Sequence, residues 1–207
     1  MTVAIKPDVI ISKANHQING LVSQAELQNC VARSIQVLRD NQATVGFAES
    51  CTGGFLSSSF AKVAGVSDVF IGSIVAYANY IKIGVLGVKS LTLEKFGAVS
   101  AECSKEMSEK VLMLLKVSYA VSVTGIAGPT GGTKDKSVGT VFISVSGISH
   151  APENKTGVTV PNIISTLTFH HDFSSYNTRE DIQLAATMQA HLNLQQFIND
   201  FENRNKN

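Results

Sequence analysis

Residues 44–54, TVGFAESCTGG, decide the fold class of this chain. The apolar run that contains their first half, ATVGFA at 43–48, predicts a short buried strand. The glycines that follow predict the start of a helix to about Val63, with Thr52 as its N-cap. A strand that turns directly into a helix is the repeating unit of α/β proteins. The same corner gathers a serine, a thiol and a threonine, so it is also a candidate place for chemistry.

The rest of the sequence continues the alternation of helices and strands. Ser23 and Glu26 predict a capping box for a helix that ends near Asp40, and Ser100 is the expected N-cap of a helix over 101–116. The remaining patterns predict strands at 68–78, 119–125, 139–147 and 166–173, and helices at 90–96 and 178–201. The strand at 68–78 is apolar almost throughout, which is typical of a strand covered on both faces. We therefore predict a three-layer α/β sandwich around a mixed, mostly parallel sheet.

Length and pattern indicate one domain with short flanking segments. The 207 residues are enough to bury a sizeable core. Residues 1–22 show no clean period and are expected to form an N-terminal extension, residues 23–201 a single domain, and residues 202–207 a polar tail. Residues 148–165 are polar and contain two prolines, so we expect an extended loop or an insertion there.

Composition excludes several classes of function. The net charge of +1 offers no basic surface for nucleic acid or for an acidic membrane. No apolar run approaches the roughly 18 residues of a membrane helix, and the N-terminus lacks the apolar core of a signal peptide. Three widely spaced cysteines without a C-x-x-C pair favour neither a disulfide framework nor a metal site. We expect a cytoplasmic protein.

Three segments follow predicted strands, where ligands of open α/β sheets bind. They are AESCTGG at 48–54, AYANYIK at 76–82 and VTGIAGPTGGTKDK at 123–136. The third is rich in glycine, threonine and lysine, which suits an anion, but it matches neither G-x-x-x-x-G-K-[ST] nor G-x-G-x-x-G. A loop that only turns the chain is an equally good interpretation of it.

Ser50 is the candidate nucleophile because it lies at a strand-to-helix corner, where unpaired N–H groups can hold an oxyanion. A serine nucleophile needs a base, and the five histidines lie outside all three segments. Lys82, directly or through Tyr77, is the best candidate base, and Lys62 is a weaker one. The alternatives remain a rim tyrosine with a solvated lysine, and a thiol nucleophile at Cys51.

These motifs, together with LGV at 86–88, GAVS at 97–100 and the late arginine in SSYNTRE, resemble the carboxy-terminal domain of the CinA proteins over about residues 25–200. That family includes stand-alone nicotinamide-nucleotide amidases. The resemblance implies an α/β sandwich that hydrolyses the carboxamide of nicotinamide mononucleotide to nicotinic acid mononucleotide and ammonia, in the recycling of pyridine nucleotides. It implies no cofactor and no metal, and a homo-oligomer.

The resemblance also assigns roles to residues. It places Ser50 on the nucleophile, and Tyr77 and Lys82 on its catalytic partners. The positions it implies for substrate binding are Glu49, Cys51, Thr52, Gly53, Gly54, Thr124, Gly125, Gly128 and Arg179.

The sequence departs from the family pattern near the late arginine, where Asn177-Thr178 replaces Gly-Asp and Gln183 replaces a second arginine. A nucleotide-binding or interaction module without catalysis, linked to competence or DNA damage, is therefore the alternative function.

Overall fold

The computed structural model describes residues 3–5, 11–12, 18, 20–149 and 162–205. In chain order its elements are β1 (Val3–Ile5), β2 (Ile11–Ser12), α1 (Gln24–Asp40), β3 (Val45–Glu49), α2 (Phe55–Ala61), the 3₁₀ turn η1 (Val66–Asp68), β4 (Phe70–Val75), α3 (Asn79–Gly84), α4 (Ser90–Phe96), α5 (Ala101–Leu115), β5 (Tyr119–Gly125), β6 (Thr140–Ser149), β7 (Asn162–Asp172) and α6 (Arg179–Asn205). Among these helices, none is long and apolar enough to cross a membrane.

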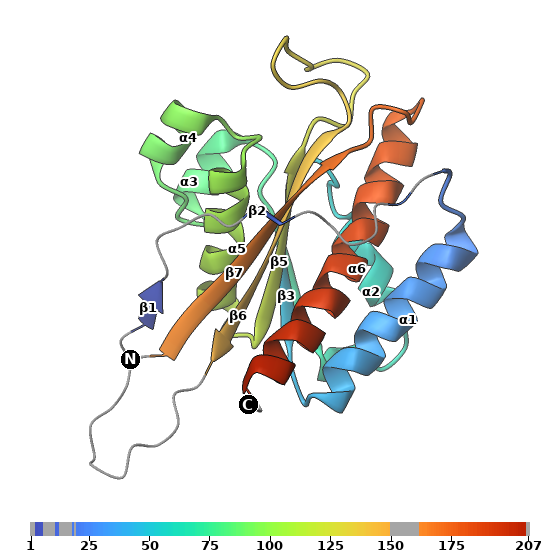
Figure 1. Ribbon diagram of the computed structural model, residues 1–207, viewed down its shortest axis with the longest axis vertical. Coiled ribbons are helices and arrows are strands. Elements are labelled where there is room, and N and C mark those ends of the chain that lie inside the picture. The colour runs from blue at the N-terminus through green and yellow to red at the C-terminus, as the bar shows by residue number, and fades with distance from the viewer. Residues whose placement is uncertain (1–2, 6–10, 13–17, 19, 150–161, 206–207) are drawn as a thin grey trace.

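The described strands form one mixed sheet in the order β1-β7-β6-β5-β3-β4, with β2 also paired to β7. The pairs of β3 with β4 and with β5 are parallel, and β6 runs antiparallel to both of its neighbours. Helices α1, α2 and α6 cover one face, whereas α5 covers the other with α3 and α4 beside it (Figure 1). The predicted three-layer α/β sandwich with a mixed, mostly parallel sheet is thereby confirmed.

Both predicted helix caps are present. The Ser23 side chain accepts a hydrogen bond from the Glu26 N–H while the Glu26 carboxylate accepts one from the Ser23 N–H, which completes the capping box of α1. Ser100 caps α5 by accepting a hydrogen bond from the Cys103 N–H at 3.1 Å. These local contacts begin each helix at the expected residue.

The strand at 68–78 was expected to be buried on both faces, and this is wrong. β4 is shorter, Phe70–Val75, and it forms one edge of the sheet, so Ile71 and Val75 are 50% and 43% exposed. An apolar run shows that a segment prefers burial, but the strand order decides how much cover it receives.

The two ends of the chain also differ from the simple flanks that we expected. β1 and β2 pair in parallel with β7, and strands this short carry too few residues to reveal a period. At the other end α6 continues to Asn205, and the Tyr119 hydroxyl donates a 2.5 Å hydrogen bond to Glu202. β6 ends at Ser149 and β7 begins at Asn162, so most of the predicted loop or insertion at 148–165 lies outside the described residues.

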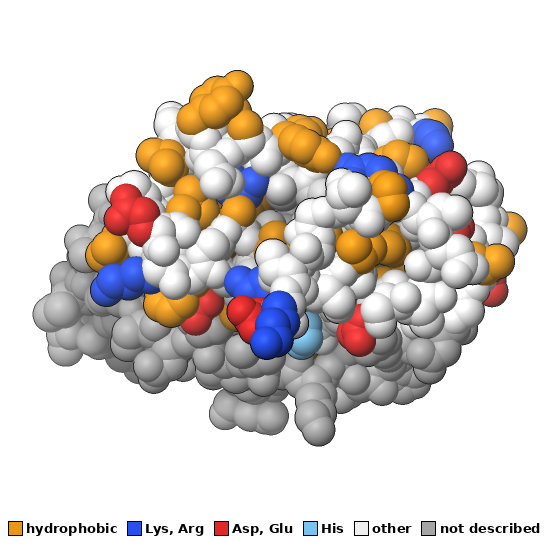
Figure 2. All heavy atoms as spheres, turned by 90° about the horizontal axis from the view of Figure 1, so that it is seen from above, with side chains coloured by type: hydrophobic (Ala, Val, Ile, Leu, Met, Phe, Trp, Pro, Cys, Tyr) orange, Lys and Arg blue, Asp and Glu red, His pale blue; other side chains and the backbone are white. Residues whose placement is uncertain are grey.

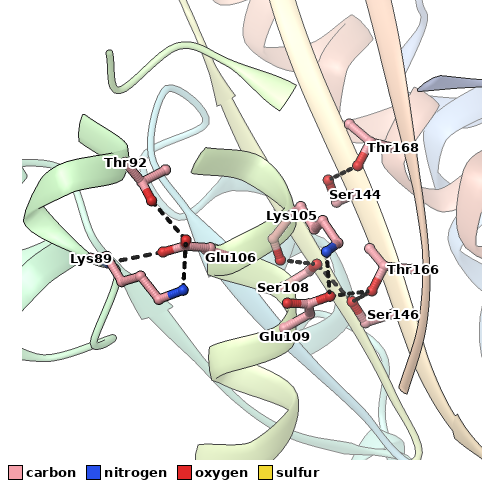
Figure 3. A network of polar contacts seen from close by, with 10 residues as sticks. All are labelled: Lys89, Thr92, Lys105, Glu106, Ser108, Glu109, Ser144, Ser146, Thr166 and Thr168. Atoms are coloured by element: carbon pink, nitrogen blue, oxygen red, sulfur yellow. Dashed lines mark hydrogen bonds and ion pairs between the residues drawn. The ribbon is translucent and has the colours of Figure 1, made fainter. Parts of the chain in front are cut away.

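The two faces of the sheet are packed differently. On one face, Phe60 of α2 packs edge-on against Phe47 and Phe70 of the sheet, which stack on each other; the ring centroids are 5.1–5.7 Å apart. Under α5 the sheet instead presents rows of small hydroxyl side chains (Figure 3). Ser144 bonds to Thr168 at 2.8 Å, and the helix contributes further hydroxyls to the same network. Small side chains let a helix approach its sheet closely, and mutual hydrogen bonds satisfy their buried oxygens.

Candidate active site

The carboxyl ends of β3, β4 and β5 surround a pocket of about 280 Å³. The three candidate segments meet there because β3 is the parallel neighbour of both other strands. Figure 2 shows this end of the molecule from above, where Lys and Arg side chains lie among hydrophobic ones. The residues that line the pocket are Ser50, Cys51, Tyr77, Asn79, Lys82, Ala98, Val99, Thr124, Gly125, Ile126, Ala127, Gly128, Thr130, Gly131 and Arg179.

Ser50 and Lys82 form a buried pair at the floor of this pocket. The Lys82 Nζ atom lies 2.9 Å from the Ser50 Oγ atom, and the lysine is 1% exposed. Nζ also donates to the carbonyl oxygens of Ala76 at 2.7 Å and Tyr77 at 3.1 Å. Burial lowers the pKa of Lys82, since the charged form loses its hydration.

This geometry suits a neutral amine. A neutral amine has two N–H groups and one lone pair. The two carbonyl oxygens take both N–H groups, so the lone pair faces the serine hydroxyl. In that state the Ser50 hydroxyl donates its proton to Nζ, which is the contact that a general base requires.

Glu49 does not reach the pocket, although we expected it to bind substrate. It is fully buried, and its carboxylate accepts hydrogen bonds from the N–H groups of Gly54 at 2.9 Å, Leu56 at 3.1 Å and Ser57 at 2.9 Å. The Ser73 hydroxyl adds a fourth bond at 3.2 Å. The N–H groups of a first helical turn have no acceptors within the helix, and this carboxylate supplies them for α2.

Thr52 is not the N-cap that we predicted. Gly54 occupies that position, and α2 begins at Phe55. The Thr52 hydroxyl is buried and has no hydrogen-bond partner among the described residues. Glu49 performs the capping from five residues or more away, so the usual one-residue cap pattern does not apply here.

Gly53 and Gly54 also lie outside the pocket. Their φ angles of 61° and 106° lie in a region that glycine adopts readily. Both residues line a separate hollow of about 640 Å³ between α1, α2 and α6. The Gly53 N–H donates to the Ser50 carbonyl oxygen at 3.1 Å, so it is not free for an oxyanion. The N–H groups of Cys51 and Thr52 have no backbone acceptor within the described chain, and they remain the candidates.

Cys51 lines the pocket, but its thiol is poorly suited to attack. Burial raises its pKa to about 12, which keeps the thiol protonated near neutral pH. Its backbone serves a different purpose, because the Gln183 side chain of α6 donates to the Cys51 carbonyl oxygen at 2.8 Å. α6 therefore holds the corner that carries Ser50.

The Gly-rich segment after β5 forms one wall of the pocket. Thr124 is buried, and its hydroxyl donates to the Ala98 carbonyl oxygen at 2.7 Å. Lys136 donates to the carbonyl oxygen of Val99 at 2.6 Å, so this wall is fastened to the loop before α5. Gly128 has φ 72°, and a Cβ atom there would lie 2.6 Å from Val138 Cγ1. The threonine and the lysine thus hold protein groups together.

Arg179 and Tyr77 meet at the mouth of the pocket. The guanidinium donates to the Gly128 carbonyl oxygen at 2.8 Å and to the Tyr77 hydroxyl at 2.6 Å. The Tyr77 hydroxyl therefore faces Arg179, while Lys82 contacts Ser50 directly. A proton relay through Tyr77 is not needed in this arrangement.

The other candidate bases lie elsewhere. Lys62 lines the larger hollow between α1, α2 and α6. His171 and His191 are buried, and burial lowers their pKa values to about 4 and about 3. His191 Nε2 lies 2.8 Å from the Ser59 hydroxyl, between α6 and α2 and away from the pocket. No group of three metal-binding side chains exists among the residues that the structure describes.

Seven residues that line the pocket were not among the predicted site residues: Asn79, Ala98, Val99, Ile126, Ala127, Thr130 and Gly131. Five of them stand inside the three candidate segments, so the sequence carries a signal for Asn79, Ile126, Ala127, Thr130 and Gly131. Ala98 and Val99 belong to the turn between two helices, and only their approach to Thr124 and Lys136 places them here.

The fold and the pocket define an α/β protein that presents a lysine-paired serine at the carboxyl end of a mixed sheet. The family model for the CinA C-terminal domain matches residues 27–198. The chain therefore belongs to the CinA C-terminal domain family.

Relatives and solved structures agree with this assignment. The chain is 45% identical over 142 residues to a CinA-like protein of Thermotoga neapolitana, which covers 69% of this chain and 34% of the relative. It is 51% identical over 125 residues to a CinA-like protein of Fervidobacterium nodosum, a match that covers 59% of this chain and 31% of the relative. The chain thus matches about a third of the length of these curated relatives.

Among solved structures, the competence/damage inducible protein CihA from Agrobacterium tumefaciens superposes with a TM-score of 0.73 at 30% identity, covering 88% of this chain and 99% of that one. A CinA superfamily protein from Klebsiella pneumoniae superposes with a TM-score of 0.70 at 26% sequence identity, covering 84% of this chain and 98% of that one.

Proposed function

We propose that this protein is an amidohydrolase that converts nicotinamide mononucleotide and water to nicotinic acid mononucleotide and ammonia. The observation that carries the proposal is the buried Lys82 amine, 2.9 Å from the Ser50 hydroxyl, with two carbonyl oxygens as its other partners. Membership of the CinA C-terminal domain family supports it.

The first half of the reaction acylates the serine. Lys82 takes the proton of the Ser50 hydroxyl, and Oγ attacks the carbonyl carbon of the carboxamide. In this proposal the N–H groups of Cys51 and Thr52, which have no backbone acceptor within the described chain, stabilise the oxyanion. One such donor contributes about 10²–10³ in rate. The Lys82 ammonium then protonates the amide nitrogen, and ammonia leaves as the C–N bond breaks.

The second half releases the acid. Lys82, neutral again, takes a proton from water, and the hydroxide attacks the acyl carbon. The bond to Ser50 Oγ breaks, and Lys82 returns the proton to the serine. Each proton that leaves a nucleophile reaches a leaving group through the same amine, so no second titrating side chain is needed.

The phosphate of the nucleotide is assigned to the mouth of the pocket. Arg179 supplies a fixed positive charge there, and its present partners are a carbonyl oxygen and a hydroxyl. Both are neutral acceptors, so a phosphate competes favourably for the same guanidinium. Gly125, Gly128 and Gly131 line the wall that the ligand contacts in this proposal. At positions 125 and 128 the missing Cβ makes room for Val141 and Val138 rather than for the ligand.

The experiment is ammonia release from nicotinamide mononucleotide by the wild type, Ser50→Ala and Cys51→Ala. Loss of turnover only in the serine variant supports the proposal. Loss only in the cysteine variant assigns the attack to the thiol. Saturable binding of the nucleotide by the wild type without ammonia release refutes the enzyme and leaves the binding module as the function.

A further inference from the structure

Two exposed polar residues that line the pocket, Asn79 and Thr130, make no side-chain hydrogen bond to the described part of the chain. Apart from the Cys51 thiol, the polar side chains of the other lining residues hydrogen-bond to protein groups. An amide without a partner that faces a ligand pocket has its full capacity for hydrogen bonds available to the ligand.

Asn79 approaches the pocket from the same side as the base. It is the first residue of α3 and precedes Lys82 by three positions, which places both on one face of the helix. Both residues line the pocket. Thr130, by contrast, belongs to the Gly-rich segment after β5 and carries a single hydroxyl.

The proposed reaction constrains where the substrate nitrogen lies. The carbonyl carbon must reach Ser50, and the carbonyl oxygen must reach the N–H groups of the corner. The nitrogen leaves after Lys82 protonates it, so it must lie against α3. There its N–H groups require an acceptor, because an amide N–H taken from water without a new partner costs binding energy.

We infer that Asn79 is the residue that recognises the carboxamide: its Oδ1 atom accepts a hydrogen bond from the substrate N–H and holds the leaving nitrogen against Lys82. This inference rests on the proposed function. It predicts that Asn79 contributes to the binding affinity of ligands that carry an N–H group at the scissile position. For ligands that lack this group, its contribution to affinity should be small.

The test uses Ser50→Ala protein, which binds without reacting, and two ligands measured by calorimetry. One ligand is nicotinamide mononucleotide. The other is the methyl ester of nicotinic acid mononucleotide, which keeps the carbonyl group but has no N–H. Adding Asn79→Leu is expected to weaken binding of the amide about tenfold, the effect of one hydrogen bond, and to leave the ester unchanged. Asn79→Asp keeps an acceptor oxygen and is expected to retain the preference for the amide.

Ile83→Ala is the matched control, since Ile83 lies on the same helix, is exposed and does not line the pocket. It should change neither affinity. Equal losses of affinity for both ligands in Asn79→Leu would overturn the inference and show that Asn79 only shapes the pocket. Unchanged affinity for both, or no binding of either by the Ser50→Ala protein, would overturn it as well.

The two claims fail separately. Ammonia release by the wild type decides the proposed function. A wild type that releases ammonia while Asn79→Leu keeps its preference for the amide refutes only the role of Asn79. A wild type without turnover, whose amide preference still depends on Asn79, refutes only the hydrolysis.

Discussion

Replacing Glu49 with alanine should destabilise the protein without removing a substrate contact. The carboxylate accepts hydrogen bonds from three N–H groups at the start of α2 and from the Ser73 hydroxyl. The family resemblance implied that Glu49 binds substrate. In the structure its carboxylate instead caps α2, just after Ser50. Loss of a cap lowers the stability of the protein, whereas loss of a ligand contact would weaken substrate binding.

The expected loss follows from the exposure of the three N–H donors. A hydrogen bond to a charged group contributes about 1.5–3 kcal/mol, and a buried donor left without an acceptor incurs the full penalty. Leu56 is buried, whereas Gly54 and Ser57 are half-buried, so water can reach the last two once the carboxylate is gone. We therefore expect Glu49→Ala to lower the free energy of unfolding by about 3 kcal/mol, well below the sum of separate bonds.

Urea unfolding followed by far-ultraviolet circular dichroism measures this change, since the chain has no tryptophan. The midpoint should fall by roughly 1–2 M at an unchanged m-value. Glu94→Gln, an exposed carboxylate on α4, is the control and should stay within about 0.5 kcal/mol of the wild type. A Glu49→Ala protein as stable as this control, with a raised KM, would refute the capping role and restore Glu49 as a ligand contact.

Three further outcomes are expected. Because burial lowers the pKa of Lys82, kcat/KM should rise with pH through that pKa and level off below the ordinary pKa of lysine. Lys82→Arg, which cannot become neutral, should abolish turnover. If that variant kept both activity and the same rise with pH, the rise would belong to another group. Gly139→Ala should prevent folding or cost more than about 4 kcal/mol, because a Cβ atom there would overlap the backbone of Ser174 and φ is 95°; circular dichroism and soluble yield measure this, and near-native stability would contradict the packing. Arg179→Met should raise KM for the mononucleotide about 10- to 100-fold and leave binding of the unphosphorylated riboside unchanged, whereas equal effects on both ligands would show that Arg179 acts only by holding Tyr77.

Much of the architecture was predictable because its signals are local. The capping box of α1 and the Ser100 cap of α5 join residues three positions apart, so they are visible in sequence and present in the structure. The strand at 119–125 agrees with β5 at both ends, since it is central and apolar. β4 was misjudged because an edge strand and a central strand carry the same apolar run, and only the strand order distinguishes them.

The site divides in the same way. The sequence alone determined that three polar segments follow three strands, and the parallel pairing of those strands brought the segments together. Only the tertiary structure decided what each side chain does there, because Ser50 meets Lys82 across 32 positions of the chain and Arg179 meets Tyr77 across 102. Burial sets whether a lysine is a solvated cation or a base, and the chain must fold before that burial exists. For the same reason Glu49, adjacent to the serine in sequence, turns away from the pocket toward the N–H groups of α2.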